Sequence, residues 1–228
     1  MNFEQGEVLL IDKPLRWTSF DVVNKLRYAL TRKIGKRIKV GHAGTLDPLA
    51  TGLLLICTGK MTKRIDEFTG MDKEYAGTFH IGATTPSYDS ETEPDNHFST
   101  AHITAELIYN TAQKFSGAME QMPPLFSAIK VAGTAAYIKA RKGKEVELKK
   151  RPVVIHQFEI TRIAVPEVDF RVKCSKGTYI RSLAFDFGKA LNSGAYLSKL
   201  CRTKIGDYKI EDALSLEQAI ERIETANT

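Results

Sequence analysis

The segment from His42 to Gly52 contains the residue best suited to chemistry, Asp47, on a loop punctuated by glycines. Gly44 and Gly52 permit a tight backbone and the close approach of a ligand, and Pro48 favours an extended conformation at Asp47. A carboxylate held in this way beside a buried strand can act as a nucleophile or as a base. The alternative is a solvated aspartate that opens a turn. That is the commoner role of an Asp-Pro pair, and spacing alone favours it.

A second candidate group lies in Lys173–Arg181, where a strand, a turn and the start of a helix are expected to meet. Arg181 would occupy the first helical turn, where the helix dipole disfavours a cation. This placement indicates an anionic partner for Arg181. An ordinary exposed arginine is the alternative, and the residue alone does not decide between the two.

The charge balance is mildly basic, with 33 Lys and Arg against 27 Asp and Glu and a net charge of +6. Such a balance permits a polyanionic partner but does not require one. Cations are concentrated between Lys139 and Arg151, and they could follow RNA phosphates together with Lys33, Arg37 and Lys39. The alternative for such a run is a solvated face.

Composition and missing motifs exclude several classes of protein. The 228 residues are 43% hydrophobic and 26% charged, which is ordinary for a globular protein and excludes disorder, collagen and coiled coil. Gly59 and Lys60 are followed by Met61 instead of the Ser or Thr of a phosphate-binding loop. The three cysteines are too widely spaced for a disulfide framework or a zinc site, which fits a reducing cytoplasm. The longest apolar run, Leu53–Cys57, is too short to cross a membrane.

The elements that must position these residues follow from periodicity and turn signals. Strands are expected at Val8–Ile11, Leu53–Cys57, Tyr75–Ala83, Leu125–Val131, Val153–Ile163 and Val168–Cys174. Helices are expected at Ser19–Thr31, Thr104–Phe115, Thr134–Arg141, Thr178–Leu191 and Leu216–Ile223. Thr18 and Asp21 form a capping box for the first helix, and Thr178 is a candidate cap. Loops are expected at 39–52 and, exposed to solvent, at 84–96. This irregular mixture predicts an α+β fold.

The segment Gly41–Gly52 closely resembles the signature loop of the TruB family of tRNA pseudouridine synthases. Further blocks match the family in order along the chain: Asp12–Pro14, Lys73–Tyr75, Phe126–Lys130, Cys174–Arg181 and Leu197–Arg202. The resemblance covers nearly the whole chain. An ordered set of blocks is far more specific than any one of them alone.

The resemblance implies the pseudouridine synthase fold, a mixed and mostly antiparallel sheet flanked by helices, as a single catalytic domain over residues 1–228. It implies isomerisation of uridine 55 in the T-loop of tRNA, in which the C–N glycosidic bond breaks, the base turns, and a C–C bond forms through C5. No cofactor and no metal are expected. The tail at 208–228 is too short for the C-terminal RNA-binding module of the PUA type. We therefore expect a stand-alone cytoplasmic monomer that contacts the tRNA T-arm without a guide RNA, a protein partner or a membrane.

The resemblance also implies roles for individual residues. Asp47 matches the catalytic aspartate, and Arg181 matches the arginine that pairs with it and keeps it ionised. Tyr75 matches the tyrosine that stacks on the flipped uracil, and it could also take the C5 proton. Tyr179 and Leu200 match residues that line the uracil pocket, with core packing as the alternative.

The resemblance also implies supporting roles for two further residues. His42 matches the histidine that fills the space left by the target base, and Lys13 is expected to give structural or electrostatic support.

Two other functions are alternatives to the isomerase. The first is a non-catalytic RNA-binding module, which would use the cations from Lys139 to Arg151. The second alternative is a nucleoside glycosidase, which would release free uracil. The acidic loop from Tyr88 to Asp95 is expected to point away from RNA.

Overall fold

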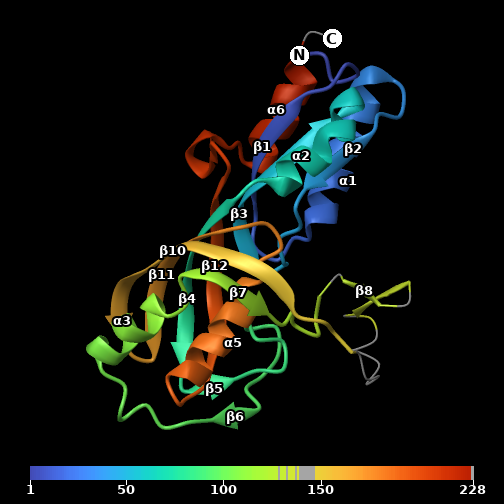
Figure 1. The fold of residues 1–228 in the computed structure, drawn as a ribbon. Coiled ribbons are helices and arrows are strands. Elements are labelled where there is room, and N and C mark those ends of the chain that lie inside the picture. The colour runs from blue at the N-terminus through green and yellow to red at the C-terminus, as the bar shows by residue number, and fades with distance from the viewer. Residues whose placement is uncertain (128, 132, 137, 139–146, 227–228) are drawn as a thin grey trace. The chain divides into compact units, whose positions relative to one another are not determined.

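The computed structural model describes residues 1–127, 129–131, 133–136, 138 and 147–226. The chain forms two compact units, unit 1 (Met1–Tyr75, Leu200–Thr228) and unit 2 (Ala76–Lys199). Two strands, β4 (Lys73–Ile81) and β12 (Ala195–Ile205), begin in one unit and end in the other. Strands and helices are mixed in both units (Figure 1), which confirms the predicted α+β class. Among the described residues, no helix has the length and apolar character needed to span a membrane.

Unit 1 is built around one central strand, β3. Its other strands and helices are β1 (Val8–Lys13), β2 (Val40–Ala43), β13 (Tyr208–Lys209), α1 (Ser19–Ile34), η1 (Gly59–Arg64), α2 (Ile65–Gly70), η2 (Ile210–Asp212) and α6 (Leu216–Thr225). The central strand β3 (Ala50–Thr58) pairs antiparallel with β1 and β2. It pairs parallel with the end of β12, where Leu200 lies opposite Ala50 and Arg202 opposite Gly52.

The side chains of β3 alternate between two hydrophobic cores. Leu54 and Ile56 pack into the core that contains the buried faces of α1 and α6. Leu53, Leu55 and Cys57 pack into a second core with residues of α2 and β12. Because both faces of the strand are covered, its sequence is continuously apolar instead of alternating.

Helix α1 begins with the capping box that the sequence predicts. The Thr18 hydroxyl accepts a hydrogen bond from the Asp21 backbone N–H (3.0 Å), and the Asp21 carboxylate accepts one from the Thr18 N–H (2.9 Å). The helix runs to Ile34 instead of Thr31 and ends at Gly35, whose φ of 78° is left-handed and suits glycine. The start of α1, which contacts the Asp47 loop, is therefore fixed by local chemistry.

Unit 2 is a sheet with helices packed on it. Its elements besides β4 and β12 are β5 (Ala83–Thr84), β6 (Asn96–His97), α3 (Ala105–Gln113), β7 (Gly117–Gln121), β8 (Lys130–Val131), β9 (Thr134–Ala135), β10 (Arg151–Ala164), β11 (Glu167–Cys174) and α5 (Ile180–Ala190). The strand order is β12-β4-β11-β10-β7, and the predicted pairing of β10 with β11 is confirmed. Phe187 of α5 contacts Phe79 and Phe158 of the sheet, which holds α5 against it.

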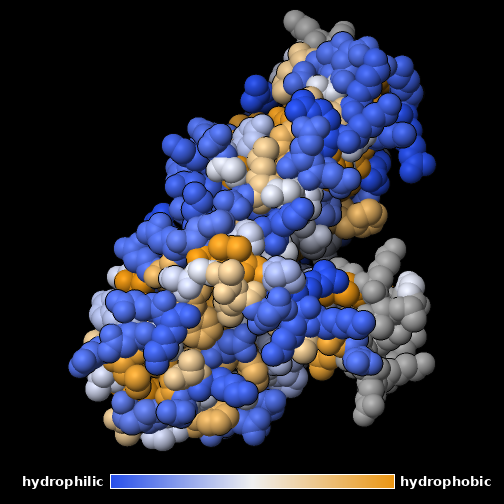
Figure 2. Space-filling model, viewed as in Figure 1, coloured by the Kyte–Doolittle hydropathy of each residue, from blue (hydrophilic) through white to orange (hydrophobic). Residues whose placement is uncertain are grey.

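Several expected elements differ from the structure. The predicted loop at 39–52 contains the strand β2, and the predicted strand at 125–131 is reduced to β8. Of the helix predicted at Thr134–Arg141, Thr134 and Ala135 form a strand, Ala136 and Ile138 are helical, and 137 and 139–146 lie outside the described residues. The segment 84–96 is mostly exposed, as predicted, but Thr84, Thr85, Ser87 and Asp89 are buried. The surface shown in Figure 2 is largely hydrophilic, with smaller apolar patches.

Candidate active site

Asp47 lies on the connection between β2 and β3, and its neighbours fix this connection. Leu46 is buried, and its N–H donates to the Ser19 hydroxyl at the start of α1 (2.8 Å). The Asp47 carbonyl accepts a hydrogen bond from the Ala50 N–H (3.0 Å), which forms a turn that leads into β3. Asp47 itself is half-buried. Asp47 thus opens a turn, as the alternative for an Asp-Pro pair predicts, and it does so on a loop beside the buried strand β3, while its catalytic role stays a prediction.

Lys13, at the end of β1, supports the same loop. Its side chain is fully buried, and its ammonium donates to the carbonyls of Trp17 (2.6 Å) and Pro14 (3.0 Å), with a longer contact to Pro48 (3.5 Å). Burial lowers the pKa of Lys13 to about 8, and the negative charge of Asp47 opposes this shift. Lys13 thus lies close enough to Asp47 for their charges to interact.

Arg202 is a buried cation that the sequence did not single out. Its guanidinium donates to the carbonyls of Leu53 (2.8 Å) and Gly44 (3.1 Å), and the side chain is 1% exposed. It therefore joins β12 to both ends of the Asp47 loop. In the sequence, Arg202 stands out only as the last residue of the block Leu197–Arg202 that matches the family. The parallel pairing that brings Arg202 to this loop is not visible in the sequence.

His42 lies in β2, near the same guanidinium. Burial lowers the pKa of His42, and the positive charge of Arg202 lowers it further. The imidazole is therefore neutral near pH 7. Within the described part of the chain, no group hydrogen-bonds the buried Nδ1 of His42.

Tyr75 and Leu200 lie on neighbouring strands of unit 1. Tyr75 is in β4 and is 9% exposed. The residue before it, Glu74, accepts hydrogen bonds from Thr203 (2.8 Å) and Lys204 (3.3 Å) of β12. Leu200 pairs with Ala50, next to the Asp47 turn. Lys13, His42, Asp47 and Leu200 are thus gathered around one loop in unit 1, and Tyr75 lies on the strand beside β12.

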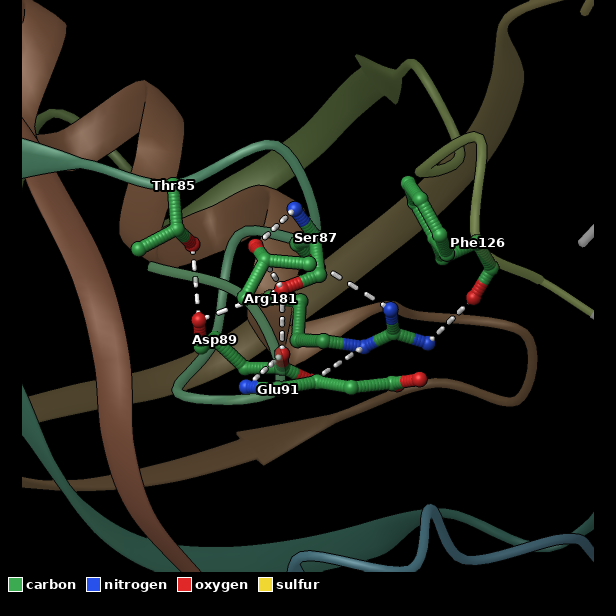
Figure 3. Close-up of polar contacts among 7 residues, drawn as sticks. Thr85, Ser87, Asp89, Glu91, Phe126 and Arg181 are labelled. Carbon is green, nitrogen blue, oxygen red and sulfur yellow. Dashed lines mark hydrogen bonds and ion pairs between the residues drawn. The ribbon is translucent and has the colours of Figure 1, made fainter. Parts of the chain in front are cut away.

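Arg181 and Tyr179 lie in unit 2, at the start of α5. The Arg181 guanidinium is 4% exposed and pairs with the Asp89 carboxylate, with 3.5 Å between Nε and Oδ2. It also donates to the carbonyls of Phe126 (2.9 Å) and Ser87 (3.2 Å), as Figure 3 shows. The prediction that Arg181 needs an anionic partner is confirmed. The resemblance names Asp47, not Asp89, as the partner of Arg181, and the pairing with Asp47 stays a prediction.

The Asp89 turn is organised by its own hydroxyls. The Asp89 carboxylate accepts hydrogen bonds from the Ser87 hydroxyl (2.6 Å) and the Glu91 N–H (2.9 Å), and the Asp89 carbonyl accepts one from Thr85 (2.7 Å). These contacts bury Thr85, Ser87 and Asp89 within a segment that its Ser, Thr, Pro and acidic composition had predicted to be exposed. Figure 3 shows this turn folded against Arg181.

Tyr179 is held by its backbone. Its N–H donates to the Gln121 side-chain carbonyl (2.8 Å), and its carbonyl accepts a hydrogen bond from the Gln121 amide (3.0 Å). Tyr179, not Thr178, is the N-cap residue of α5, which corrects the sequence prediction. The Thr178 hydroxyl instead donates to the Ser175 carbonyl (2.9 Å).

The sequence matches a family model described as TruB family pseudouridylate synthase (N terminal domain) over residues 32–180. A tRNA pseudouridine synthase B of Flavobacterium johnsoniae is 63% identical over 214 residues, 93% of this chain and 93% of that protein. The protein of the same name from Phocaeicola vulgatus is 59% identical over 218 residues, 95% of this chain and 93% of that protein. The chain therefore belongs to the TruB family of pseudouridylate synthases, which makes it an isomerase.

Solved structures agree with this family assignment. A chain of a Cbf5-Nop10-Gar1 complex matches with a TM-score of 0.73 and 29% identity over 96% of this chain and 54% of that chain. A chain of an H/ACA RNP bound to a substrate RNA containing 2'-deoxyuridine matches with a TM-score of 0.70 and 26% identity over 96% of this chain and 53% of that chain. This chain spans about half the length of each. The predicted pseudouridine synthase fold is confirmed.

Proposed function

We propose that the protein converts uridine 55 in the T-loop of tRNA to pseudouridine, with Asp47 as the catalytic carboxylate. The observation that carries the proposal is the fixed position of Asp47 beside the buried ammonium of Lys13. Relatives more than half identical over most of their length carry the name tRNA pseudouridine synthase B. Their substrate class supports tRNA as the substrate here.

The reaction is an isomerisation, so no other reactant is consumed. Asp47 attacks or deprotonates the ribose, and the bond between C1′ and N1 of uracil breaks. The detached base turns and C5 bonds to C1′, while Asp47 leaves C1′ or returns the proton it took from the ribose. The C5 proton is then lost, and N1 gains a proton. The buried Lys13 ammonium lies close enough to Asp47 for the two charges to interact.

The remaining site residues bind and orient the base in this proposal. Tyr75 stacks on the flipped uracil and recovers part of the unstacking energy, roughly 1–3 kcal/mol. Tyr179 and Leu200 line the uracil pocket. His42, whose buried Nδ1 has no hydrogen-bond partner among the described groups, fills the space that the base leaves in the T-loop. Arg181 is proposed to support Asp47 during catalysis.

The decisive experiment is tritium release from tRNA labelled at C5 of uridine, with the purified protein alone. Asp47→Asn removes the negative charge at nearly constant size, so release should fall by at least about 1,000-fold while tRNA binding changes little. Asp66→Asn, an exposed carboxylate of α2, is the matched control and should retain full activity. Full turnover by Asp47→Asn would refute the assignment.

The same assay tests the remaining parts of the proposal. Mapping the product by position in tRNA tests uridine 55, because label should be released there and at no other uridine. Turnover without added protein or guide RNA is the expected result for a monomer that acts alone. Free uracil among the products would instead indicate a glycosidase.

A further inference from the structure

Unit 1 has a concave site at the end of β3 away from Asp47. It is a cavity of about 290 Å³ that we call the basic pocket. Its charged lining residues are Glu4, Lys36, Arg37, Lys39, Lys60 and Lys63. Five cations thus face one carboxylate, and all five are exposed to solvent. On the face shown in Figure 2, this end of unit 1, near α2 and β2, is predominantly hydrophilic.

The basic pocket is assembled from separate segments by backbone contacts. The turn after α1 supplies residues 36–39, and η1 supplies residues 59–63. The Gly59 N–H donates to the Lys39 carbonyl (2.8 Å), and the Lys60 N–H donates to the Glu4 carbonyl (3.3 Å). Gly59 has a φ of 52°, and a Cβ on it would lie 2.2 Å from the Glu4 carbonyl oxygen. The fold therefore brings together cations that are distant in sequence.

Few of these charges are compensated inside the protein. Glu4 pairs with Lys36 (2.8 Å), and the Lys60 ammonium donates to the neutral Gln5 side chain (2.7 Å). Among the described residues, no acidic side chain forms an ion pair with Arg37, Lys39 or Lys63. The C-terminal end of α1 carries the negative end of the helix dipole, which favours cations in the turn that follows α1. This dipole does not explain the cations of η1. The excess positive charge in a concave site is suited to phosphate groups.

The basic pocket is too far from Asp47 to hold the reacting nucleotide. The nine residues of β3 span roughly 26 Å at the usual rise per residue. Asp47 precedes the first residue of this strand, and Gly59 follows the last. A ligand in the pocket that belongs to the substrate must therefore be a distant part of the same RNA.

We propose that the basic pocket binds backbone phosphates of the substrate tRNA outside the T-arm. This inference rests on the proposed function, because it assumes that tRNA occupies the Asp47 loop at the same time. Phosphate contacts position an RNA without reading its sequence. The pocket therefore contributes to affinity for whole tRNA and does not take part in the chemistry. A free polyphosphate offers the same chemistry, and the experiment separates the two sources.

The test variant is Arg37→Glu/Lys63→Glu, which reverses one charge on each segment and leaves the pair between Glu4 and Lys36 intact. The matched control is Lys114→Glu/Lys189→Glu, which makes the same change in net charge on exposed lysines of unit 2. For whole tRNA, KM should rise roughly tenfold in the test variant, with kcat unchanged. The slope of log affinity against log salt should flatten by about 0.7–0.9 for each phosphate that the variant no longer binds. The control should change neither quantity.

A T-arm stem-loop serves as the second substrate, and its KM should be the same for the test variant and the wild type. Whole-tRNA values within twofold of the control would overturn the proposal, as would an equal rise in KM on the stem-loop. Pyrophosphate is the probe for a free anion. If the variant loses pyrophosphate binding and keeps its affinity for tRNA, the RNA assignment is wrong. Because affinity and salt slope are measured by binding, they test the pocket even if the protein does not turn over tRNA.

Discussion

The guanidinium of Arg181 and the carboxylate of Asp89 form an ion pair inside unit 2, with 3.5 Å between them and exposed fractions of 4% and 7%. Removing one partner of such a pair leaves the other charge buried without compensation, which is costly. Asp89→Asn should therefore lower the free energy of unfolding by about 3 kcal/mol. Equilibrium denaturation in urea measures this change.

An exposed ion pair of the same unit is the control. Asp169 pairs with Arg162 (2.5 Å), but the side chains are 29% and 46% exposed. Solvent screens this pair, so Asp169→Asn should cost no more than about 1 kcal/mol. Similar changes for the two variants would show that burial does not set the strength of the pair between Arg181 and Asp89.

Gly52 is required where β3 approaches β12. Its φ is 102°, and a Cβ on it would lie 2.4 Å from the Arg202 carbonyl oxygen. Gly52→Ala should therefore destabilise the protein by about 3 kcal/mol or more and reduce activity by displacing the Asp47 loop. Gly70→Ala is the control, because a Cβ there meets no atom within 4 Å, and it should change stability by less than about 1 kcal/mol. A stable Gly52→Ala protein with full activity would contradict this.

Lys13 should make stability depend on pH. Burial lowers its pKa from 10.5 to about 8, so between these pH values the unfolded chain binds more protons than the folded one. The free energy of unfolding therefore rises with pH in this window. Relative to Lys13→Met, the wild type should gain up to about 3 kcal/mol across it.

Urea denaturation of both proteins near pH 8 and near pH 10 measures the effect of Lys13. Other titrating groups cancel in the difference between wild type and variant. Lys25→Met, at an exposed position of α1, should give a difference that does not depend on pH. A constant difference for Lys13→Met would mean that the Lys13 ammonium is not desolvated.

Tyr75 can be tested for stacking and for proton transfer separately. Tyr75→Phe keeps the aromatic face, so a stacking role predicts little change in kcat/KM. Tyr75→Leu should lose roughly 1–3 kcal/mol of base stacking, or about 5-fold to 150-fold. A reduction in Tyr75→Phe as large as that in Tyr75→Leu would instead assign the hydroxyl to removal of the C5 proton. Tritium release measures both variants.

The sequence predicted those elements whose signals are local. The capping box of Thr18 and Asp21 marked the start of α1, and the apolar run of β3 marked a buried strand. Helix-dipole reasoning at Arg181 correctly predicted an anionic partner. In the first two cases, the residues that determine the structure lie close together in the sequence. In the third, the prediction follows from a single arginine in the first turn of a helix.

The sequence could not predict features set by distant contacts. The segment around Asp89 has the composition of an exposed loop and is mostly exposed, but Asp89 itself is buried by its pairing with Arg181 and by its contacts with neighbouring hydroxyls. Arg202 reaches the Asp47 loop only through the parallel pairing of Leu200 with Ala50. No local pattern reports a register between strands so far apart in the chain, which is why the sequence did not reveal the role of Arg202.

That parallel pairing has a consequence for synthesis of the protein. The strand that follows Asp47 is synthesised well before its partner, which carries Arg202. Until then Gly44 and Leu53 lack the guanidinium that joins them. A nascent chain from which the Arg202 strand has not yet emerged should therefore lack an ordered Asp47 loop, so that order in this loop follows synthesis of the distant strand.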